Sequence, residues 1–483
     1  MRKLDSFKKI LVLWMAPLGY LFQAILYGWF WINYYYPVVS RPTISRDGYV
    51  MGGGLKLYMK GHLLIILIYF ALLLLASRTF GGSQVGYLKK LDVFTSQIFE
   101  LGMVNVISYC QISLMNNWLV PVRPIVTLFV IQLLFAWIWT WFSERSYRIA
   151  FPPRELLIIY GERSVRDILA KFESRKDMFS VRKCMNISEG LKALEAECEN
   201  GYGAVVLWDI PASYRNDLIK FCYARSIRIY MMPKITDVLI QGAGQMHLFD
   251  TPILVIRDYA LKTEQRWIKR MIDIVCALIL LILASPFMLV TAVCIKAYDH
   301  GPALYKQIRC TENGREFEIL KFRSMRVDAE KDGVARLAAQ NDSRITPIGS
   351  FIRKVRIDEL PQLINILRGD MSFIGPRPER PEIIAQYMED MPEFAFRMKV
   401  RAGLAGYAQV YGKYNTTPYD KLKLDLAYIQ NYSVWLDLKL MLLTLKILLR
   451  PESTEGVSAD QITAMKNEEY RHSDEYDREE KEP

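Results

Sequence analysis

Long apolar stretches fill the first part of the chain, and each approaches the ~20 residues that a helix needs to cross a bilayer. These stretches lie at about 10–33, 63–77, 97–119 and 125–142. The second and fourth are apolar on every face, which is typical of helices in lipid rather than of a soluble bundle. The third is weaker because it contains Glu100 and several polar residues. The pattern predicts four transmembrane helices within residues 1–147.

Basic residues flank these stretches unevenly. They precede the first stretch and follow the second and the fourth, at Arg2, Lys3, Lys8, Lys9, Arg78, Lys89, Lys90, Arg145, Arg148 and Arg154. Lys and Arg are enriched on the cytoplasmic side of membrane proteins, so both ends of the bundle are expected in the cytoplasm. The 36–61 loop is also basic, which weakens the signal. The first apolar run is long and lacks a small-residue cleavage site, so a removable signal peptide is not expected.

From 148 to 260 the pattern changes to short apolar runs that alternate with amphipathic segments. The runs "ELLIIYG", "YGAVVLW", "IRIYMMP" and "PILVI" are typical of strands, and "VRDILAKFE" and "YRNDLIKFCYA" of helices. This alternation predicts a Rossmann-like parallel α/β domain. The turn "IIYGERSVRD" carries only Gly161 where a dinucleotide site would have G-x-G-x-x-G. A regulatory or docking role is therefore favoured over cofactor binding.

A further membrane-length apolar run covers 268–296, at the start of a third domain that is expected to span 261–450. Basic residues flank both of its ends, and Ser285 and Pro286 lie near its middle. Proline bends a helix by removing a hydrogen bond, and serine can bond the freed backbone group. We therefore favour a re-entrant helix–break–helix hairpin, which anchors an α/β domain from the cytoplasmic face, over a fifth membrane span.

The chain ends in two segments of different character. Residues 434–450 are apolar with interspersed charges, which predicts a helix in or near the membrane interface. Residues 451–483 hold 11 acidic and 4 basic side chains and few large apolar ones. This tail is expected to be disordered. Because the tail is acidic, the rest of the chain is more basic than the formal net charge of +11 indicates.

Composition narrows the chemistry. The seven cysteines form no C-x-x-C pair and the four histidines are far apart. Neither a disulfide framework, a zinc site nor histidine catalysis is expected. A basic body favours anionic partners, such as lipid headgroups or nucleotides. Nucleic acid is not expected, because the chain shows no motif for binding it. Carboxylates and arginines must carry any reaction.

One segment, "RKVRIDELPQLINILRGDMSFIGPRPERP" (353–381), combines adjacent acids with arginines and an apolar helix. Apolar residues follow at i, i+3, i+4 and i+7 from Leu360, and Gly369 closes the helix. Alone, this pattern would make Asp358 an N-cap and Glu359 a first-turn acid favoured by the helix dipole.

The surrounding cations outnumber what two carboxylates need for pairing. They are Lys321, Arg323, Arg326, Arg353, Arg356, Arg377 and Arg380. A large anion such as a diphosphate would account for the surplus, because the guanidinium fork matches phosphate oxygens. One acid can then attack phosphorus while the other holds Mg²⁺ with the substrate phosphates. The positive surroundings are expected to keep Asp358 ionised.

Residues from about 265 to 450 resemble the bacterial sugar transferases, the monotopic polyprenyl-phosphate phosphoglycosyl transferases. The resemblance rests on "KRMIDIVCALILLILASPFMLV", "KFRSMR", "RKVRIDELPQLINILRGDMSFIGPRP", "VRAGLAGYAQVYG" and "LDLAYIQNYSVWLDLKLMLLT". The DELPQ helix together with the GPRP turn is highly specific. The four leading spans and the Rossmann-like middle are similar to the long members, which initiate exopolysaccharide, capsule or O-antigen synthesis.

The resemblance implies a two-step reaction at the bacterial inner membrane, with the catalytic domain in the cytoplasm. Asp358 and Glu359 would be the catalytic pair. Asp358 would attack the sugar-bearing phosphate of a UDP-sugar and release UMP, and undecaprenyl phosphate would then take the phosphosugar. Glu359 would hold Mg²⁺, and Arg353 would bind phosphate. The Ser285-Pro286 break would shape the re-entrant hairpin among the membrane lipids.

Other assignments stay open at this point. Lys321 and Arg323 share a strand-like alternation that favours phosphate binding over a solvated face. Arg377 and Arg380 would either contact phosphate or be surface arginines. Arg401 and Gln409 would either contact the nucleotide or fix a loop. Asp425 and Tyr428 are more typical of structural residues. The sugar is open between glucose and galactose, and a homodimer is one of the oligomeric states left open.

Two rival functions remain. Tyr419 and Lys423 have the Tyr-x-x-x-Lys spacing of nucleotide-sugar dehydratases and epimerases, which would need NAD(P) and no lipid. The missing glycine-rich fingerprint argues against that reading. Alternatively, the chain is a scaffold or regulator in which the acid pair only caps a helix.

Overall fold

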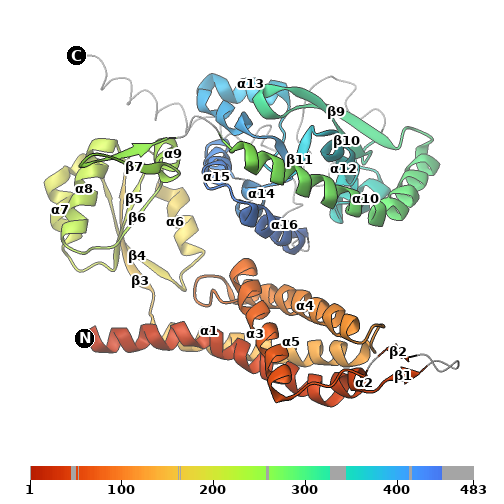
Figure 1. Ribbon diagram of the computed structural model, residues 1–483. Helices are drawn as coiled ribbons and strands as arrows, with labels where there is room; N and C mark the ends of the chain where they lie inside the picture. The colour runs from red at the N-terminus through yellow and green to blue at the C-terminus, as the bar shows by residue number, and fades with distance from the viewer. Residues whose placement is uncertain are drawn as a thin grey trace. The chain divides into compact units, whose positions relative to one another are not determined.

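The computed structural model describes residues 2–44, 50–52, 54–161, 163, 165–256, 260–326, 344–412 and 416–448. The chain forms two compact units, Met1–Met231 and Met232–Pro483. Figure 1 colours the chain from red at the N-terminus to blue. The acidic tail from residue 451 lies outside the described residues, so its disorder stays a prediction.

The first unit begins with a helical bundle (Figure 1). Its elements are α1 (Arg2–Phe30), the π-helical turn η1 (Trp31–Tyr35), α2 (Tyr36–Ser40), β1 (Thr43–Ile44), β2 (Val50–Gly52), α3 (Met59–Phe80), α4 (Lys90–Met115) and α5 (Arg123–Ala150). Helix α1 packs against α3 and α5. Within the described residues, four helices are long and apolar enough to cross a membrane: α3, α4 and α5 of this bundle, and α10 of the second unit.

The polar residues of the third apolar stretch point into the bundle, which explains its weak hydrophobic signal. Glu100 is fully buried on α4. Its Oε2 accepts a hydrogen bond from the Tyr20 hydroxyl at 2.7 Å, and its Oε1 accepts one from the Gly82 backbone N–H at 2.7 Å. Asn105 on the same helix donates to Gln132 of α5 at 2.9 Å. Polar groups at membrane depth are tolerated when they face the bundle interior and are paired in this way.

The predicted parallel sheet follows the bundle. Its elements are β3 (Arg154–Tyr160), α6 (Val165–Glu173), β4 (Phe179–Asn186), η2 (Ile187–Glu189), α7 (Leu191–Cys198), β5 (Ala204–Trp208), α8 (Ala212–Ala224) and β6 (Ile229–Met231). The strands lie in the order β4-β3-β5-β6, and all pairs are parallel. Helices α7 and α8 cover one face through Leu194, Cys198, Leu218 and Cys222. A closer likeness to dinucleotide-binding domains stays a prediction.

Two strands of this region differ from the expectation. The "PILVI" segment is a strand, β8 (Thr251–Val255), but it pairs antiparallel with β7 (Gly244–Leu248) in a separate hairpin of the second unit. The prediction that it joins the parallel sheet is therefore wrong. The fourth strand of the sheet is instead β4, at its edge. The sequence pattern does not reveal β4, because the strand has a solvent-exposed side that carries polar residues.

The second unit contains the expected catalytic region. Its further elements are α9 (Ile235–Gln241), α10 (Thr263–Asp299), β9 (Leu304–Cys310), η3 (Glu312–Gly314), β10 (Glu316–Phe322), α11 (Pro347–Lys354), η4 (Ile357–Glu359), α12 (Gln362–Arg368), β11 (Met371–Ile374), α13 (Pro381–Asp390), η5 (Pro392–Lys399), β12 (Ala402–Ala405), α14 (Tyr407–Tyr411), α15 (Pro418–Gln430) and α16 (Val434–Leu448). Strands β9 and β10 form an antiparallel pair, and β11 and β12 a parallel pair. The core between them gathers Leu363, Ile366, Met371, Phe394 and Leu422.

Helix α10 is continuous from Thr263 to Asp299 with Pro286 inside it, and the Ser285 hydroxyl donates to the Ile282 carbonyl at 2.8 Å. No non-helical residue therefore separates the two halves of α10, and a bend of its axis at Ser285-Pro286 stays a prediction. The middle of α10 is apolar and exposed, whereas both of its ends are bound to the rest of the second unit.

The N-terminal end of α10 is held by Lys269, which pairs with Asp437 of α16 at 2.6 Å, and by Asp273, which accepts a hydrogen bond from Ser372 at 3.0 Å. Near the other end, Ile295 packs with Phe322 and Ile352. Asp273 and Ile295 would be about 33 Å apart along a straight helix. Both ends of α10 are therefore attached to the same globular unit. The re-entrant hairpin stays a prediction.

Candidate active site

The two adjacent acids lie on a short 3-10 turn between α11 and α12. Arg356 has a left-handed backbone (φ 59°) that ends α11 and starts the turn η4, and Pro361 precedes α12. Neither helix start has a side-chain cap, so the alternative interpretation of Asp358 as an N-cap is wrong. Its Oδ1 is buried and has no hydrogen-bond partner among the residues that the structure describes. Burying a carboxylate oxygen without a hydrogen bond costs free energy. Helix capping does not account for Asp358 at this position.

Helix α12 fixes this turn against strand β10. Leu363 lies in the core as expected, and Gly369 ends the helix in the left-handed conformation (φ 89°). Asn365 is fully buried on the same helix. Its Oδ1 accepts from the Leu320 N–H at 3.0 Å, and its Nδ2 donates to the Glu318 carbonyl at 2.8 Å. These bonds set the acids beside the strand that carries Lys321.

Three cations surround Glu359. Arg377 donates to its Oε1 at 3.0 Å, and the same oxygen lies 3.6 Å from Arg356 and 4.0 Å from Lys321. The carboxylate is largely buried, with 13% of its side chain exposed. Arg353 acts on Asp358 electrostatically. The structure thus brings together Asp358, Glu359, Lys321, Arg353 and Arg377, as the sequence predicted.

Burial and charge give the two acids different acidities. Burial, and next the Glu359 charge, raise the pKa of Asp358 to about 6, against the opposing effect of Lys321, Arg353 and Arg356. Burial also raises the pKa of Glu359, but Arg377, Lys321 and Arg356 outweigh it and bring the pKa well below the usual range. The effect of desolvation therefore exceeds that of the cations at Asp358. Its carboxylate is nevertheless mostly ionised at neutral pH.

Lys321 completes the cluster. Burial lowers the pKa of its ammonium to about 8, although Glu359 acts in the opposite direction. The group therefore loses its charge at a pH where an arginine would keep it. Pairs of groups whose pKa values are moved apart by their surroundings are typical of sites that carry out chemistry.

The acid pair fits a Mg²⁺ ion. All three cation contacts of Glu359 involve Oε1, so Oε2 is the oxygen left to bind a metal. No group of three or more His, Cys, Asp or Glu side chains that could hold a metal occurs among the described residues. Mg²⁺ often binds through one or two carboxylates and completes its shell with waters and substrate phosphates. The Glu359 carboxylate is a ligand of this kind.

Other predicted binding residues lie in different surroundings. Arg323 is buried and ion-paired with Asp299 at the end of α10. Arg401 is 3.6 Å from Glu312. Arg380 lies near Arg309, and both polar side-chain atoms of Gln409 are buried with no partner within the described part of the chain. The assignment of these four residues to substrate binding stays a prediction.

Two contributors have no site role in the sequence prediction. Arg356 is predicted only as one of the surrounding cations, and Arg309 only as a basic residue after the apolar run 268–296. Arg309 lies near Lys321, and the β9–β10 register pairs Arg309 with Phe317 and Tyr305 with Lys321, on one side of the hairpin. Period-2 alternation was the available signal, but it could not reveal Arg309 without the register.

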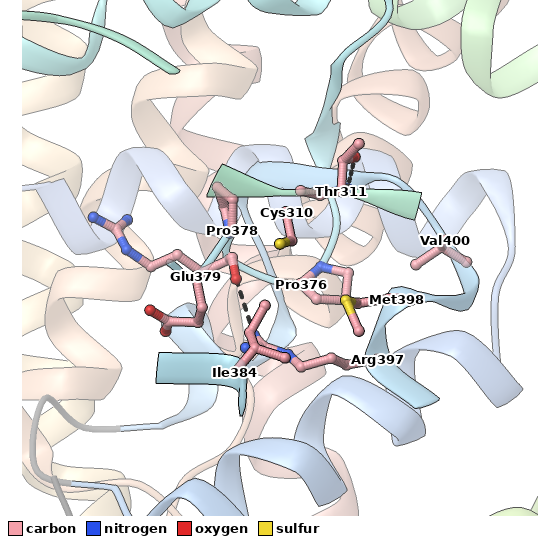
Figure 2. A pocket seen from close by; sticks show the side chains of 11 residues that line it. Cys310, Thr311, Pro376, Pro378, Glu379, Ile384, Arg397, Met398 and Val400 are labelled. Atoms are coloured by element: carbon pink, nitrogen blue, oxygen red, sulfur yellow. Dashed lines mark hydrogen bonds between the residues drawn. The ribbon is translucent and has the colours of Figure 1, made fainter. Parts of the chain in front are cut away.

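A small cavity lies under the turn at 375–380 (Figure 2). It is lined by Cys310, Thr311, Pro376, Arg377, Pro378, Glu379, Ile384, Arg397, Met398, Val400 and Ala402. Its volume is about 10 Å³, which is about the room one water molecule needs. The cavity is therefore too small to take a sugar nucleotide, and its residues support the turn.

The spacing of Tyr419 and Lys423 does not produce an open catalytic pair. Lys423 is buried and ion-paired with Asp420 at 2.7 Å, and its ammonium lies 4.6 Å from the Tyr419 ring centre. This arrangement gives Lys423 a structural role.

Comparisons with known proteins cover the region that contains this site. A family model described as "Bacterial sugar transferase" matches residues 264–451. A UDP-glucose:undecaprenyl-phosphate glucose-1-phosphate transferase of Caulobacter vibrioides is 41% identical over 190 residues, which is 38% of this chain and 71% of that protein. The chain belongs to the bacterial sugar transferase family.

Longer bacterial sugar transferases match the same region. A UDP-N-acetylgalactosamine-undecaprenyl-phosphate N-acetylgalactosaminephosphotransferase of Aeromonas hydrophila is 38% identical over 231 residues, 47% of this chain and 54% of that protein. A UDP-glucose:undecaprenyl-phosphate glucose-1-phosphate transferase of Escherichia coli K12 is 39% identical over 221 residues, 45% of this chain and 47% of that protein. The chain thus spans about half the length of these two relatives.

Proposed function

We propose that this protein transfers a sugar-1-phosphate from a UDP-sugar to undecaprenyl phosphate, as an undecaprenyl-phosphate hexose-1-phosphate transferase. The observation that carries the proposal is the buried, unpartnered Oδ1 of Asp358, next to a strongly acidic carboxylate and within a cluster of cations. The names of the family members above support the two substrate classes. By the same likeness, the product initiates a bacterial surface polysaccharide.

In the first step, Asp358 attacks the sugar-bearing phosphorus of the diphosphate. A bond forms between a carboxylate oxygen of Asp358 and this phosphorus, and the bond from phosphorus to the bridging oxygen breaks, so UMP leaves with that oxygen and the electron pair. Lys321, Arg353 and Arg377 stabilise the charge on the phosphate oxygens. Bound Mg²⁺ would neutralise further charge on the diphosphate, with Glu359 as its protein ligand.

In the second step, a phosphate oxygen of undecaprenyl phosphate attacks the same phosphorus. The bond to Asp358 breaks, which returns the carboxylate and gives the diphosphate-linked lipid. The energy of the phosphate linkage is conserved because one covalent bond replaces another at each step. The two-step route lets UMP leave before the lipid arrives, so a single cationic cluster can serve both phosphates.

The lipid substrate requires that this cluster lie at a membrane surface. We propose that α10 enters and leaves by the cytoplasmic face of the bacterial inner membrane. That proposal is supported by the attachment of both α10 ends to the same globular unit and by the exposed apolar residues between them. Helix α16 also exposes apolar side chains at Trp435 and Leu445, which suits an interfacial position.

The test uses membranes that contain the full chain, a panel of UDP-sugars, undecaprenyl phosphate and Mg²⁺, with UMP as the readout. Asp358→Asn retains the shape of the side chain and removes the nucleophile, so UMP release should fall to background. Glu318→Gln is the matched control, because this glutamate is exposed and paired with Lys306. Full turnover by Asp358→Asn would refute the mechanism. Sugar modification that needs NAD(P) and no lipid would favour the dehydratase or epimerase class.

A further inference from the structure

The turn that carries Arg377 is held at four successive carbonyl groups, each by a different donor. The bonds are Gly403 N–H to Pro376 O (2.9 Å), Arg397 Nη2 to Arg377 O (3.0 Å), Arg309 Nη1 to Pro378 O (3.2 Å) and Cys310 N–H to Glu379 O (3.0 Å). Two of these donors are guanidinium groups. Figure 2 shows Arg397 next to this turn, with Pro376, Pro378 and Glu379 around it. The position of Arg377 is therefore set by side chains as well as by the sheet.

Strand β12 approaches this turn very closely at Gly403. Gly403 approaches so closely that a Cβ atom on it would lie 2.1 Å from the Gly375 nitrogen. Only a glycine fits at that distance, which brings strand β12 into contact with the turn. Beyond this glycine contact, the two guanidinium groups hold the turn at the carbonyls of Arg377 and Pro378.

Arg397 is itself fixed by a buried acid. Its side chain is 3% exposed and that of Asp425, on α15, is 1% exposed. Arg397 Nε and Nη2 lie 3.0 Å and 2.8 Å from Asp425 Oδ2. A buried ion pair of this kind contributes little net stability compared with apolar residues of the same size. Its presence in the core is better explained by a requirement for position than by stability.

The contacts form one path from the core to the acid pair. Asp425 orients Arg397, and the Nη2 of Arg397 binds the main-chain carbonyl of Arg377. The guanidinium of Arg377 then donates to Glu359 at 3.0 Å. Among the described residues, Arg397 and Asp425 make none of the hydrogen bonds or ion pairs of Glu359 and Asp358, and the hydrogen bonds above link the buried pair to Glu359 through Arg377.

We infer that Arg397 and Asp425 are positioning residues, which hold Arg377 where it can bind the diphosphate of the sugar nucleotide and pair with Glu359. This inference rests on the proposed function. Arg309, which is paired with Glu379 at 3.5 Å and binds the next carbonyl, supports the same turn from the β9 side. Asp425 was expected from the sequence to be structural, and the geometry gives it a role in the site through Arg397.

A double-mutant cycle separates positioning from simple core stability. The double replacement Arg397→Met with Asp425→Leu removes the buried pair without leaving a charge unpaired, so folding is expected to survive. In the full chain in membranes, kcat/KM for the UDP-sugar should fall roughly 100-fold, as displacement of a binding group by about 1 Å can cause. In an Arg377→Ala background the same replacement should change kcat/KM by about twofold or less, because effects through one residue are not additive.

The cycle is also measured as the Kd for inorganic diphosphate, which needs no turnover. If no UDP-sugar is consumed but the diphosphate cycle is non-additive, the proposed function fails while the positioning role stands. Should the double replacement not fold, Arg397→Lys serves in its place, because lysine keeps the charge pair with Asp425 but cannot reach both partners. Arg315→Met is the control, since Arg315 is exposed and pairs with Asp370, away from the turn that carries Arg377. Equal losses with and without Arg377, or no loss in a folded variant, would overturn the inference.

Discussion

The acidities within the site predict a bell-shaped pH dependence for UMP release. Asp358 must be ionised to attack phosphorus, and its pKa of about 6 sets the acid limb. Lys321 must be charged to stabilise the phosphate oxygens, and its pKa of about 8 sets the alkaline limb. The rate therefore rises as pH increases through the first value and falls as pH increases through the second. The maximum is expected near neutral pH.

The size of the effect follows from the two pKa values. At one pH unit beyond either value, the active form of the group is about a tenth of the total, so UMP release should fall roughly tenfold at about pH 5 and at about pH 9. Lys321→Arg keeps the charge at every pH in this range, because an arginine side chain stays protonated. The variant should therefore lose the alkaline limb and keep the acid limb.

The assay measures kcat/KM for UMP release, from initial rates at UDP-sugar concentrations well below KM, because kcat/KM reports the pKa values of the free protein; Mg²⁺ and ionic strength are held constant. Lys306→Arg is the matched control, since Lys306 lies on the same hairpin but is exposed and paired with Glu318. Two results would refute the reasoning: a profile that stays flat across the range, or an alkaline limb that persists unchanged in Lys321→Arg.

Three further predictions follow from the contacts. Glu359→Gln should raise the Mg²⁺ concentration needed for half-maximal UMP release and leave the fold intact; an unchanged Mg²⁺ titration would contradict the metal assignment. Lys269→Met leaves Asp437 buried without its cation and should lower the free energy of unfolding by roughly 3–5 kcal/mol, whereas adding Asp437→Leu should restore most of it; equal unfolding curves for Lys269→Met and the parent would contradict the importance of this pair. With the exposed Cys110 and Cys294 replaced by serine, Lys262→Cys and His300→Cys at the two ends of α10 should both react with an impermeant thiol reagent from the cytoplasmic side only; labelling of the second from the far side would exclude the hairpin.

Much of the secondary structure could be predicted because it rests on local pattern. The apolar stretches gave α3, α4, α5 and α10, and alternation gave the core strands of the parallel sheet. Strand β4 was missed because one of its sides faces solvent, and "PILVI" was placed in the wrong sheet. Pairing partners depend on contacts distant in sequence, which a local pattern does not contain.

The candidate site also has a part that the sequence predicts and a part that it does not. Asp358, Glu359, Arg353 and Arg356 lie within one short segment, so their proximity was evident from the sequence. The pairing of Arg397 with Asp425 was not, because it joins two helical elements that only the folded core brings together. The sequence shows the cations near Asp358, but it does not show the burial that raises the pKa of this carboxyl.

The central claim is a covalent bond between Asp358 and phosphorus. Its most direct measurement is mass spectrometry of the full chain incubated with a UDP-sugar and Mg²⁺ in the absence of undecaprenyl phosphate, followed by acid quenching and peptide mapping. The account predicts the mass of one sugar phosphate on the peptide that contains Asp358, lost again when the lipid phosphate is added. Release of UMP with no such adduct at any time point, or an adduct that forms equally in Asp358→Asn, would contradict it.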